Sequence, residues 1–345
     1  MKEKILFIGP ISPPVTGPGV KNKIMTDWLH LKSDVKIETI NTLGLNRLKL
    51  MDVIRFLLLF VRHKVIILSV SKNGRFIFIP ICFILRKKVI LFPAGGYFDL
   101  EIKKLGRFGR NIFLKTISCV DVVYSQTETL KEGLIKMGLK KVVYFPNPRL
   151  NRGYIAKGED LSNTFKIVFL SKIKVEKGPL LLIESLENVR RENPQINIEL
   201  CFYGVIENSF RKEFLDAIKI NKLNKYCGIA NPDSVQEIIS KYNLFVLPTF
   251  YKGEGAPGAL IEAMMTGIPI ITTDFLGVEE LILNQVDGIV IRQSNIKELI
   301  FAINQVIRNT ELREKITKNV KLKAQNYDID RLMPALVEDI ELIKK

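Results

Sequence analysis

The sequence has few of the residues that build metal centres and disulfide frameworks. It contains two histidines and four cysteines among 345 residues. Two histidines are too few for a histidine-built metal site. The cysteines, which are Cys82, Cys119, Cys201 and Cys227, are widely spaced and form no paired motif. Such spacing favours neither a zinc site nor a disulfide framework, and it indicates a reducing compartment.

Long uncharged apolar runs are also missing. The most apolar region, residues 56–92, is interrupted repeatedly by charged side chains and histidine. Its longest uncharged runs reach only about half of the ~20 residues that a membrane-spanning helix needs. Residues 1–9 read as a short strand, and no small-residue cleavage pattern follows them. We therefore expect neither a membrane span nor a secretory signal.

Acidic charge is scarce in the first half. The net charge is +16; residues 1–165 hold 28 Lys and Arg against 12 Asp and Glu, and residues 166–345 hold 24 of each. The whole excess therefore belongs to the first half and favours an anionic partner there, such as a membrane surface or an acidic substrate. No nucleic-acid reader pattern accompanies the charge, so nucleic acid is not expected as a partner.

A cluster of cations lies within this basic half. Its members are Lys103, Lys104, Arg107, Arg110 and Lys115. Two interpretations remain open for them: a solvated helix face, or a surface that faces the acceptor or a membrane.

Apolar strands alternate with helical segments along the chain, which predicts an α/β protein with parallel sheets. At this length roughly two domains are expected. A polar, glycine-containing stretch at 150–164 reads as the linker between them. We place the first domain at residues 1–155 and the second at 165–328.

The most informative stretch is 243–280. It reads as a buried strand at 244–247, a glycine-rich loop, a helix at 260–265 and a second strand at 268–273. In parallel sheets such loops lie at the carboxyl ends of the strands, where ligands bind. Pro257 suits the first helical position. The amides of Gly255, Ala256, Gly258 and Ala259 would then face an anionic or hydroxyl-rich ligand at the helix N-terminus.

Two carboxylates flank this loop. Glu254 precedes it, and Glu262 follows after seven intervening residues. A carboxylate accepts two hydrogen bonds at once, as a vicinal diol of ribose or a sugar requires. Taken singly, Glu254 suits a solvated loop and Glu262 suits a helix acid that complements the dipole. The two together, with Gly-Ala-Pro-Gly between them, favour a ligand site.

Two further loops offer ligand contacts. Gly17 and Gly19 would let the backbone approach a ligand closely, although a plain strand-to-helix turn is the alternative, because the third glycine of a dinucleotide fingerprint is missing. Lys172 and Lys177 follow the strand at 166–170, and such cations suit a diphosphate leaving group. Lys174 is a nearby alternative. Lys177 is favoured because Gly178 and a helix start follow it.

These motifs resemble glycosyltransferase family 4, whose members are retaining, nucleotide-sugar-dependent enzymes of the GT-B fold. Glu254 and Glu262 match its E-x7-E signature. Gly95 and Gly96 resemble its "HGG.F" loop, with Ala94 where histidine is usual. Ser171 and Lys172 replace Gly and Arg of its "GR....KG" loop, and Gly204 resembles its glycine near the nucleotide.

The resemblance implies two Rossmann-like domains facing across a cleft, with the acceptor domain first and the donor domain second. The helix at 329–345 is expected to pack back on the first domain. Glu254, Lys177 and Lys172 would be catalytic, while Lys103, Lys104, Arg107 and Arg110 would face the acceptor or a membrane. The expected donor-binding residues are Gly17, Gly19, Gly95, Gly96, Lys172, Lys177, Gly204, Glu254, Gly255, Ala256, Pro257, Gly258 and Glu262.

The implied reaction moves a hexosyl or N-acetylhexosaminyl group from a nucleoside-diphosphate sugar, with UDP favoured and GDP possible, to a hydroxyl of a glycan or lipid-linked acceptor. The setting would be bacterial capsule, O-antigen or lipopolysaccharide synthesis, at the inner face of the plasma membrane. Neither a metal nor a cofactor is expected. The alternatives are a catalytically impaired donor-binding protein and an epimerase of the same fold, for which His30 and His63 are poorly placed.

Overall fold

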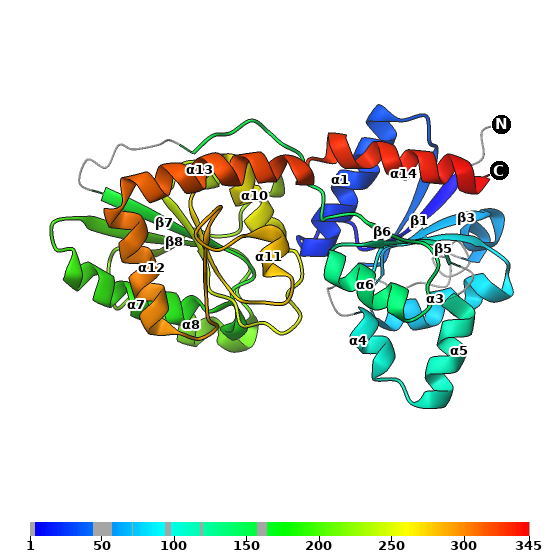
Figure 1. Ribbon diagram of the computed structural model, residues 1–345, viewed down its shortest axis with the longest axis horizontal. Coiled ribbons are helices and arrows are strands. Elements are labelled where there is room, and N and C mark those ends of the chain that lie inside the picture. Colours follow the sequence, from blue (N-terminus) through cyan, green and yellow to red (C-terminus); the bar gives the residue numbers. More distant parts are fainter. Residues whose placement is uncertain are drawn as a thin grey trace. The chain divides into compact units, whose positions relative to one another are not determined.

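The structure is a computed structural model that describes residues 4–43, 57–70, 72–93, 98–117, 120–156 and 164–344. The chain divides into two compact units (Figure 1). Unit 1 comprises Met1–Leu150 with Tyr327–Lys345, and unit 2 comprises Asn151–Asn326. Each unit holds one six-stranded sheet whose strand pairs are all parallel. The predicted α/β class is therefore confirmed.

The sheet of unit 1 has the strand order β2-β1-β3-β4-β5-β6. Its strands are β1 (Ile5–Gly9), β2 (Ile37–Asn41), β3 (Val65–Leu68), β4 (Lys88–Leu91), β5 (Val120–Ser125) and β6 (Val142–Tyr144). Its helices are α1 (Gly17–Lys32), α3 (Lys72–Ile84), α4 (Phe98–Lys103), α5 (Arg107–Ile117), α6 (Glu128–Lys136) and α14 (Ile329–Lys344), with a further helical segment at 57–62.

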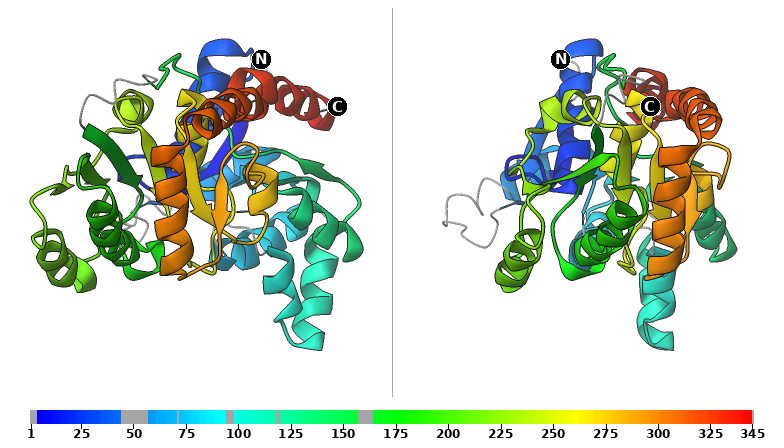
Figure 2. Two further views of the ribbon diagram at one scale, coloured as in Figure 1. Left: turned by 60° about the vertical axis from the view of Figure 1, so that its left-hand side comes forward. Right: turned by 90° about the vertical axis from the view of Figure 1, so that its left-hand side faces the viewer.

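Side chains alternate between the two faces of this sheet, as the pleat of a strand requires. Ile5 and Phe7 belong to the core on the side of α1 and α14, whereas Leu6 and Ile8 belong to the core on the side of α3, α4, α5 and α6. Both faces are buried, so the strands read as nearly continuous apolar runs. The hairpin of α4 and α5 extends away from the sheet in both further views (Figure 2).

Helix α14 lies beside α1, although about three hundred residues of sequence separate their contacting side chains (Figure 1). Met333, Leu336 and Ile340 are completely buried in the core that α1 shares. At the start of α14, the Asp330 carboxylate accepts hydrogen bonds from Lys32 Nζ at 2.6 Å and Trp28 Nε1 at 2.6 Å. The chain therefore returns to unit 1 through both apolar packing and ion pairing.

The sheet of unit 2 has the order β12-β11-β10-β7-β8-β9. Its strands are β7 (Thr164–Leu170), β8 (Asn197–Tyr203), β9 (Asn224–Tyr226), β10 (Leu244–Leu247), β11 (Ile270–Thr273) and β12 (Ile289–Ile291). Its α-helices are α7 (Pro179–Glu192), α8 (Arg211–Ile218), α9 (Val235–Ile239), α10 (Gly258–Thr266), α11 (Val278–Leu281), α12 (Ile296–Arg308) and α13 (Thr310–Ala324).

The predicted crossover at 243–280 is present as β10, α10 and β11, but the prediction for Pro257 was wrong. Pro257 is the residue that caps α10 rather than its first helical residue, because its ψ of 121° is extended. Its carbonyl accepts hydrogen bonds from the amides of Leu260 and Ile261 at 3.1 and 3.2 Å. Gly267 ends the helix in the left-handed conformation (φ 75°) that favours glycine.

Candidate active site

The candidate site of unit 2 is built where the loop after β7 meets the loop after β10. The amide of Phe250 donates to the carbonyl of Glu176 at 2.8 Å, and Thr249 Oγ1 donates to the same carbonyl at 3.2 Å. Gly178 has a φ of 75°, and a Cβ there would lie 2.2 Å from the Pro248 carbonyl oxygen. Glycine at this position therefore allows the two loops to approach each other this closely.

Lys177 and Glu254 form a buried ion pair across these two loops. Their residues are only 9% and 7% exposed, and Lys177 Nζ contacts Glu254 Oε2. The same oxygen accepts a hydrogen bond from Thr249 Oγ1 at 3.0 Å. Two residues that the sequence nominated separately, one for a diphosphate and one for a sugar, are thus direct neighbours in space.

The Tyr251 ring gathers the cations of the site. Lys174 Nζ lies 3.6 Å from the centroid of this ring, and Lys177 Nζ lies 5.0 Å from it. Both ammonium groups are attracted by the electron-rich face of the ring. Tyr251 was not nominated from the sequence, because an aromatic residue in a loop has no distinguishing spacing.

Lys172 lies apart from this group. Its Nζ pairs with Glu207 Oε1 at 2.6 Å, and its side chain is half exposed. The hydrogen bond from Lys172 lowers the pKa of the Glu207 carboxyl. The structure therefore brings Lys174, rather than Lys172, together with Lys177, although the sequence favoured Lys172 as the second cation.

Glu262 is held by a side chain that the sequence analysis missed. It lies on α10, is 7% exposed, and its Oε2 accepts a hydrogen bond from Gln236 Nε2 at 2.5 Å. Gln236 Oε1 in turn accepts from the backbone amide of Arg152 at 2.9 Å. Gln236 is almost completely buried on α9, so it fixes the orientation of the carboxylate. A glutamine in a short helix that also contains Glu237 is the only sequence signal that pointed to it.

The start of α10 supplies backbone donors. Gly258 and Ala259 are its first two residues, and within the described part of the chain their amides have no hydrogen-bond partner. The helix dipole places partial positive charge at this end. Ala256, also nominated from the sequence, is buried in the loop that leads to the helix.

Three other nominated glycines have different roles in the structure. A Cβ on Gly204 would lie 1.8 Å from the Ser171 carbonyl oxygen, and one on Gly19 would lie 2.6 Å from the Thr16 hydroxyl that caps α1. These two glycines are explained by close packing. Gly17, in contrast, has open space where a Cβ would lie. Ala94, Gly95 and Gly96 lie outside the described residues.

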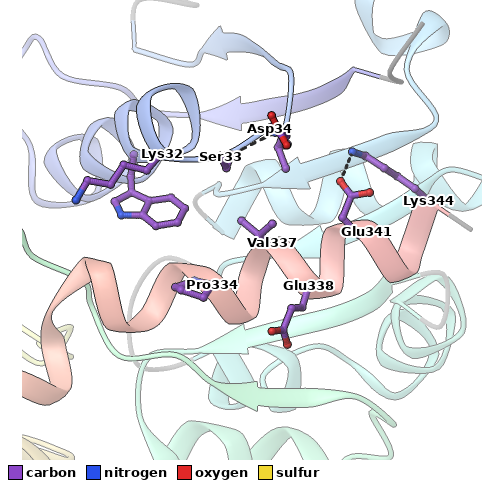
Figure 3. A pocket seen from close by; sticks show the side chains of 10 residues that line it. Lys32, Ser33, Asp34, Pro334, Val337, Glu338, Glu341 and Lys344 are labelled. Atoms are coloured by element: carbon purple, nitrogen blue, oxygen red, sulfur yellow. Dashed lines mark hydrogen bonds and ion pairs between the residues drawn. The ribbon is translucent and has the colours of Figure 1, made fainter.

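A groove of about 690 Å³ lies elsewhere, between the end of α1 and α14 in unit 1 (Figure 3). Its lining includes Asp34, Glu338 and Glu341, and Lys344 Nζ is paired with Glu341 Oε1 at 2.8 Å. The lining holds more acids than lysines, and both of its lysines, Lys32 and Lys344, are paired with carboxylates, so the groove is not the candidate site. The single Asp-x-Asp triplet of the sequence, Asp328 to Asp330, begins α14, where Asp330 is engaged by Lys32 and Trp28.

The sequence model described as "Glycosyl transferases group 1" matches residues 154–323. This range includes every residue of the candidate site in unit 2 except Arg152. An uncharacterized glycosyltransferase of Haemophilus influenzae is 24% identical over 261 residues, or 71% of each chain. The UDP-Gal:alpha-D-GlcNAc-diphosphoundecaprenol alpha-1,3-galactosyltransferase of Escherichia coli is 26% identical over 166 residues, which cover 48% of this chain and 42% of that enzyme.

Among solved structures, Anabaena Alr3699/HepE in complex with UDP has a TM-score of 0.74 at 16% identity, over 98% of this chain and 99% of its own. Together these similarities define the class: the protein has the GT-B fold, which confirms the predicted fold class. It is a glycosyltransferase. Its assignment to family 4 stays a prediction.

The buried pair predicts a specific stability effect. Lys177→Met leaves the Glu254 carboxylate buried without its cation, which costs about 3–5 kcal/mol of unfolding free energy. The double variant Lys177→Met, Glu254→Gln removes both charges and should recover a large part of that loss. Urea unfolding measures both changes.

Lys172→Met is the matched control, because its ion pair is exposed, and it should leave the unfolding free energy unchanged. A double variant as unstable as Lys177→Met alone would show that charge pairing does not hold these loops together.

Proposed function

We propose that this protein is a retaining, metal-independent glycosyltransferase of family 4. It moves a hexosyl or N-acetylhexosaminyl group from a nucleoside-diphosphate sugar, with UDP as the favoured nucleotide, to a hydroxyl of a lipid-linked glycan. The observation that carries the proposal is the convergence of Lys174, Lys177 and Glu254 beside the N-terminus of α10. Solved structures of Alr3699/HepE with UDP and with UDP-glucose support a nucleotide-sugar donor.

In this mechanism the donor binds unit 2. Glu262, oriented by Gln236, accepts hydrogen bonds from the ribose hydroxyls. Glu254 and the amides at the start of α10 hold the donor sugar. Lys177 and Lys174 lie against the diphosphate and stabilise the negative charge that grows on it as the glycosidic bond breaks. Retention requires the acceptor oxygen to bond to the face of the anomeric carbon that the diphosphate leaves.

The cations take the part that a divalent metal plays in other phosphate chemistry. A metal neutralises developing charge on the leaving oxygens, and two ammonium groups beside one ring supply positive charge in the same place. Because Lys177 and Glu254 contact each other, donor binding would draw the Lys177 ammonium away from the Glu254 carboxylate and towards the diphosphate. The carboxylate is then available to the sugar hydroxyls.

The epimerase alternative is disfavoured by the position of the histidines. Unit 2 contains none. His30 is exposed on α1, while His63 is buried in unit 1 with Nδ1 2.7 Å from the Leu59 carbonyl. A donor-binding protein without activity is the second candidate, favoured by Ala94 and Ser171 where the family has histidine and glycine.

Measurement of turnover separates an active glycosyltransferase from a donor-binding protein without activity. Lys177→Met should lower kcat by about 10²–10³-fold, the scale of one electrostatic stabiliser, with a smaller effect on donor affinity. Lys174→Met should cost more activity than Lys172→Met, because only Lys174 shares the Tyr251 ring with Lys177. Release of nucleoside diphosphate from a panel of UDP- and GDP-sugars, with lipid-linked acceptors, measures these effects.

Lys241→Met serves as a control, because Lys241 is exposed two residues after α9 and pairs with Glu237. EDTA should leave the wild-type rate unchanged, and strong inhibition would contradict metal independence. No turnover with any donor, while UDP still binds, would favour the inactive donor-binding protein.

Unit 1 presents a surface suited to an anionic membrane. Phe108 and Ile84 are 80% and 74% exposed, on α5 and α3. These two helices pack together through Phe76 and Phe113, whose ring centroids are 4.5 Å apart. Apolar side chains are therefore displayed on the outside of the helices that cover one face of the sheet.

Cations flank Phe108 in the sequence. Lys104, Arg107 and Arg110 have no ion pair with any residue that the structure describes, and Lys103 pairs with Asp99 at 3.4 Å. Each Lys or Arg close to an anionic membrane contributes about 1 kcal/mol. We therefore propose that unit 1 docks on the inner face of the plasma membrane and there reaches a lipid-linked acceptor. Within the described residues no helix is long and apolar enough to span the bilayer.

Vesicle sedimentation tests the docking. The protein should bind anionic but not neutral vesicles, and the binding should fade as the Debye length falls from ~10 Å at 0.1 M salt to ~3 Å at 1 M. Replacing Lys103, Lys104 and Arg107 by Glu should abolish it. Replacing Lys212, Lys219 and Lys222 of unit 2 by Glu changes the net charge equally and should not. Equal indifference to both vesicle types at low salt would refute the docking.

A further inference from the structure

Two cysteines of unit 2 are well separated in the sequence but are neighbours in the structure. Cys201 lies on β8, and Cys227 directly follows β9, the edge strand that pairs with β8. Cys201 lies opposite Lys225 in the register of these strands, and the Cys227 amide donates to the Phe202 carbonyl at 2.9 Å. The two thiols are hydrogen-bonded to each other. The fold therefore forms a thiol pair that the spacing of the cysteines did not indicate.

Two tyrosine hydroxyls surround this pair. Cys201 and Tyr203 share one face of β8, because side chains alternate along a strand. The Tyr203 hydroxyl lies 3.2 Å from the Tyr242 hydroxyl. Tyr242 is also hydrogen-bonded to Cys201, and Tyr203 to Cys227. None of these four side chains has a part in the donor site described above, so the cluster needs an explanation of its own.

The pair combines a stabilised thiolate with access to solvent. The hydrogen bond from the Cys227 thiol, together with that from the Tyr242 hydroxyl, lowers the pKa of Cys201 against the opposing effect of burial. The hydrogen bond to Cys201 raises the pKa of Cys227. The pair therefore loses one proton easily and the second with difficulty. Cys201 is 6% exposed, whereas Cys227 is exposed, so a small oxidant reaches Cys227 from solvent.

We propose that Cys201 and Cys227 form a redox site that a hydroperoxide converts from a dithiol to a disulfide, and that this disulfide slows glycosyl transfer at the donor site. The oxidation does not depend on the proposed function, whereas the effect on transfer rests on it.

With hydrogen peroxide the oxidation takes two steps. The Cys201 thiolate takes the proton of the Cys227 thiol while the Cys227 sulfur attacks one peroxide oxygen. An S–O bond forms and the O–O bond breaks, and the hydroxide that leaves takes the proton from Cys201 and becomes water. The Cys201 thiolate then attacks the sulfur of the Cys227 sulfenic acid, so the S–S bond forms, the S–O bond breaks, and hydroxide leaves to be protonated by solvent. The two sulfurs together lose the two electrons that reduce the peroxide.

Hydrogen bonds connect the thiol pair to the loop after β7, which carries the cations of the site. The carbonyl of Gly228, directly after Cys227, accepts from the Gly204 amide at 2.9 Å. The carbonyl of Val205 accepts in turn from the Ile173 amide at 2.9 Å. A disulfide holds its sulfurs at about 2.05 Å, closer than any hydrogen bond does. Oxidation must therefore shift Cys227, and these bonds pass the shift through the loop after β8 to the loop after β7.

Peptide mass spectrometry tests the oxidation. The full-length protein is treated with hydrogen peroxide, the remaining thiols are alkylated, and the peptides are analysed without reduction. Peptides linked through Cys201 and Cys227 are expected from the wild type. They are also expected from the double variant Cys82→Ala, Cys119→Ala, which retains only the proposed pair. Cys227→Ser should form no such link. Wild type in which these two cysteines stay unlinked, or in which Cys227 is oxidised only to a sulfinic acid, would overturn the redox site.

Release of nucleoside diphosphate tests the effect on transfer. Turnover by the oxidised wild type should fall about 10- to 100-fold, since a displacement on the order of 1 Å costs that much at a catalytic site. Dithiothreitol should restore it, and the double variant should lose and regain turnover in the same way. Cys227→Ser is the matched control, because it should turn over like the reduced wild type both before and after peroxide. Loss of turnover by Cys227→Ser would assign the inhibition to another oxidised group.

Hydrogen–deuterium exchange provides a readout that needs no activity. Exchange at 171–178 should differ between the oxidised and the reduced wild type, and should stay the same in peroxide-treated Cys227→Ser. A linked protein with unchanged turnover and unchanged exchange overturns the regulation. Absence of turnover with every donor in the reduced protein contradicts the proposed function instead, and exchange at 171–178 then decides whether the disulfide acts on the site.

Discussion

The candidate site depends on how this protein compensates buried charge. Lys177 and Glu254 lie 77 residues apart in the sequence, and their ion pair joins the loop after β7 to the loop after β10. Neither charge is stable in that position without the other. Where this ion pair brings the two loops together, Gly178 lies close to Pro248. The Glu176 carbonyl accepts hydrogen bonds from the loop after β10 in the same place. A charged ligand can compete for one member of this ion pair, so a site held together by opposite charges is also suited to bind such a ligand.

The two units compensate charge in different ways. In unit 2 the buried cation has an acid beside it, and acidic and basic residues are equal in number over 166–345. Residues 1–165, most of which belong to unit 1, carry the whole basic excess. Surface cations around α4 and α5 extend the same excess outward. On this account the basic excess of unit 1 is compensated by the anionic lipid headgroups that its surface binds.

The fold was largely predictable from the sequence, because strands buried on both faces produce nearly continuous apolar runs. The run at 244–247 and the stop at Gly267 predicted β10 and the end of α10 correctly, whereas the ligand site that the spacing of Glu254 and Glu262 indicates stays a prediction. Tertiary partners could not be predicted in this way. Gln236, Thr249 and Tyr251 reach the site from segments whose local patterns are ordinary. Lys172 was preferred over Lys174 because it occupies the position of the motif's cation. The spacing of the residues could not show that the Glu207 carboxylate would form an ion pair with Lys172.

The central claim is that the loop and helix of unit 2 around Glu254 and Glu262 bind the nucleoside diphosphate of the donor. Hydrogen–deuterium exchange with and without UDP tests it most directly, because the measurement locates binding along the chain. The account predicts slower exchange at 172–178 and 249–266, with Glu262→Ala abolishing this protection. Protection by UDP that leaves both segments of unit 2 unchanged would contradict it.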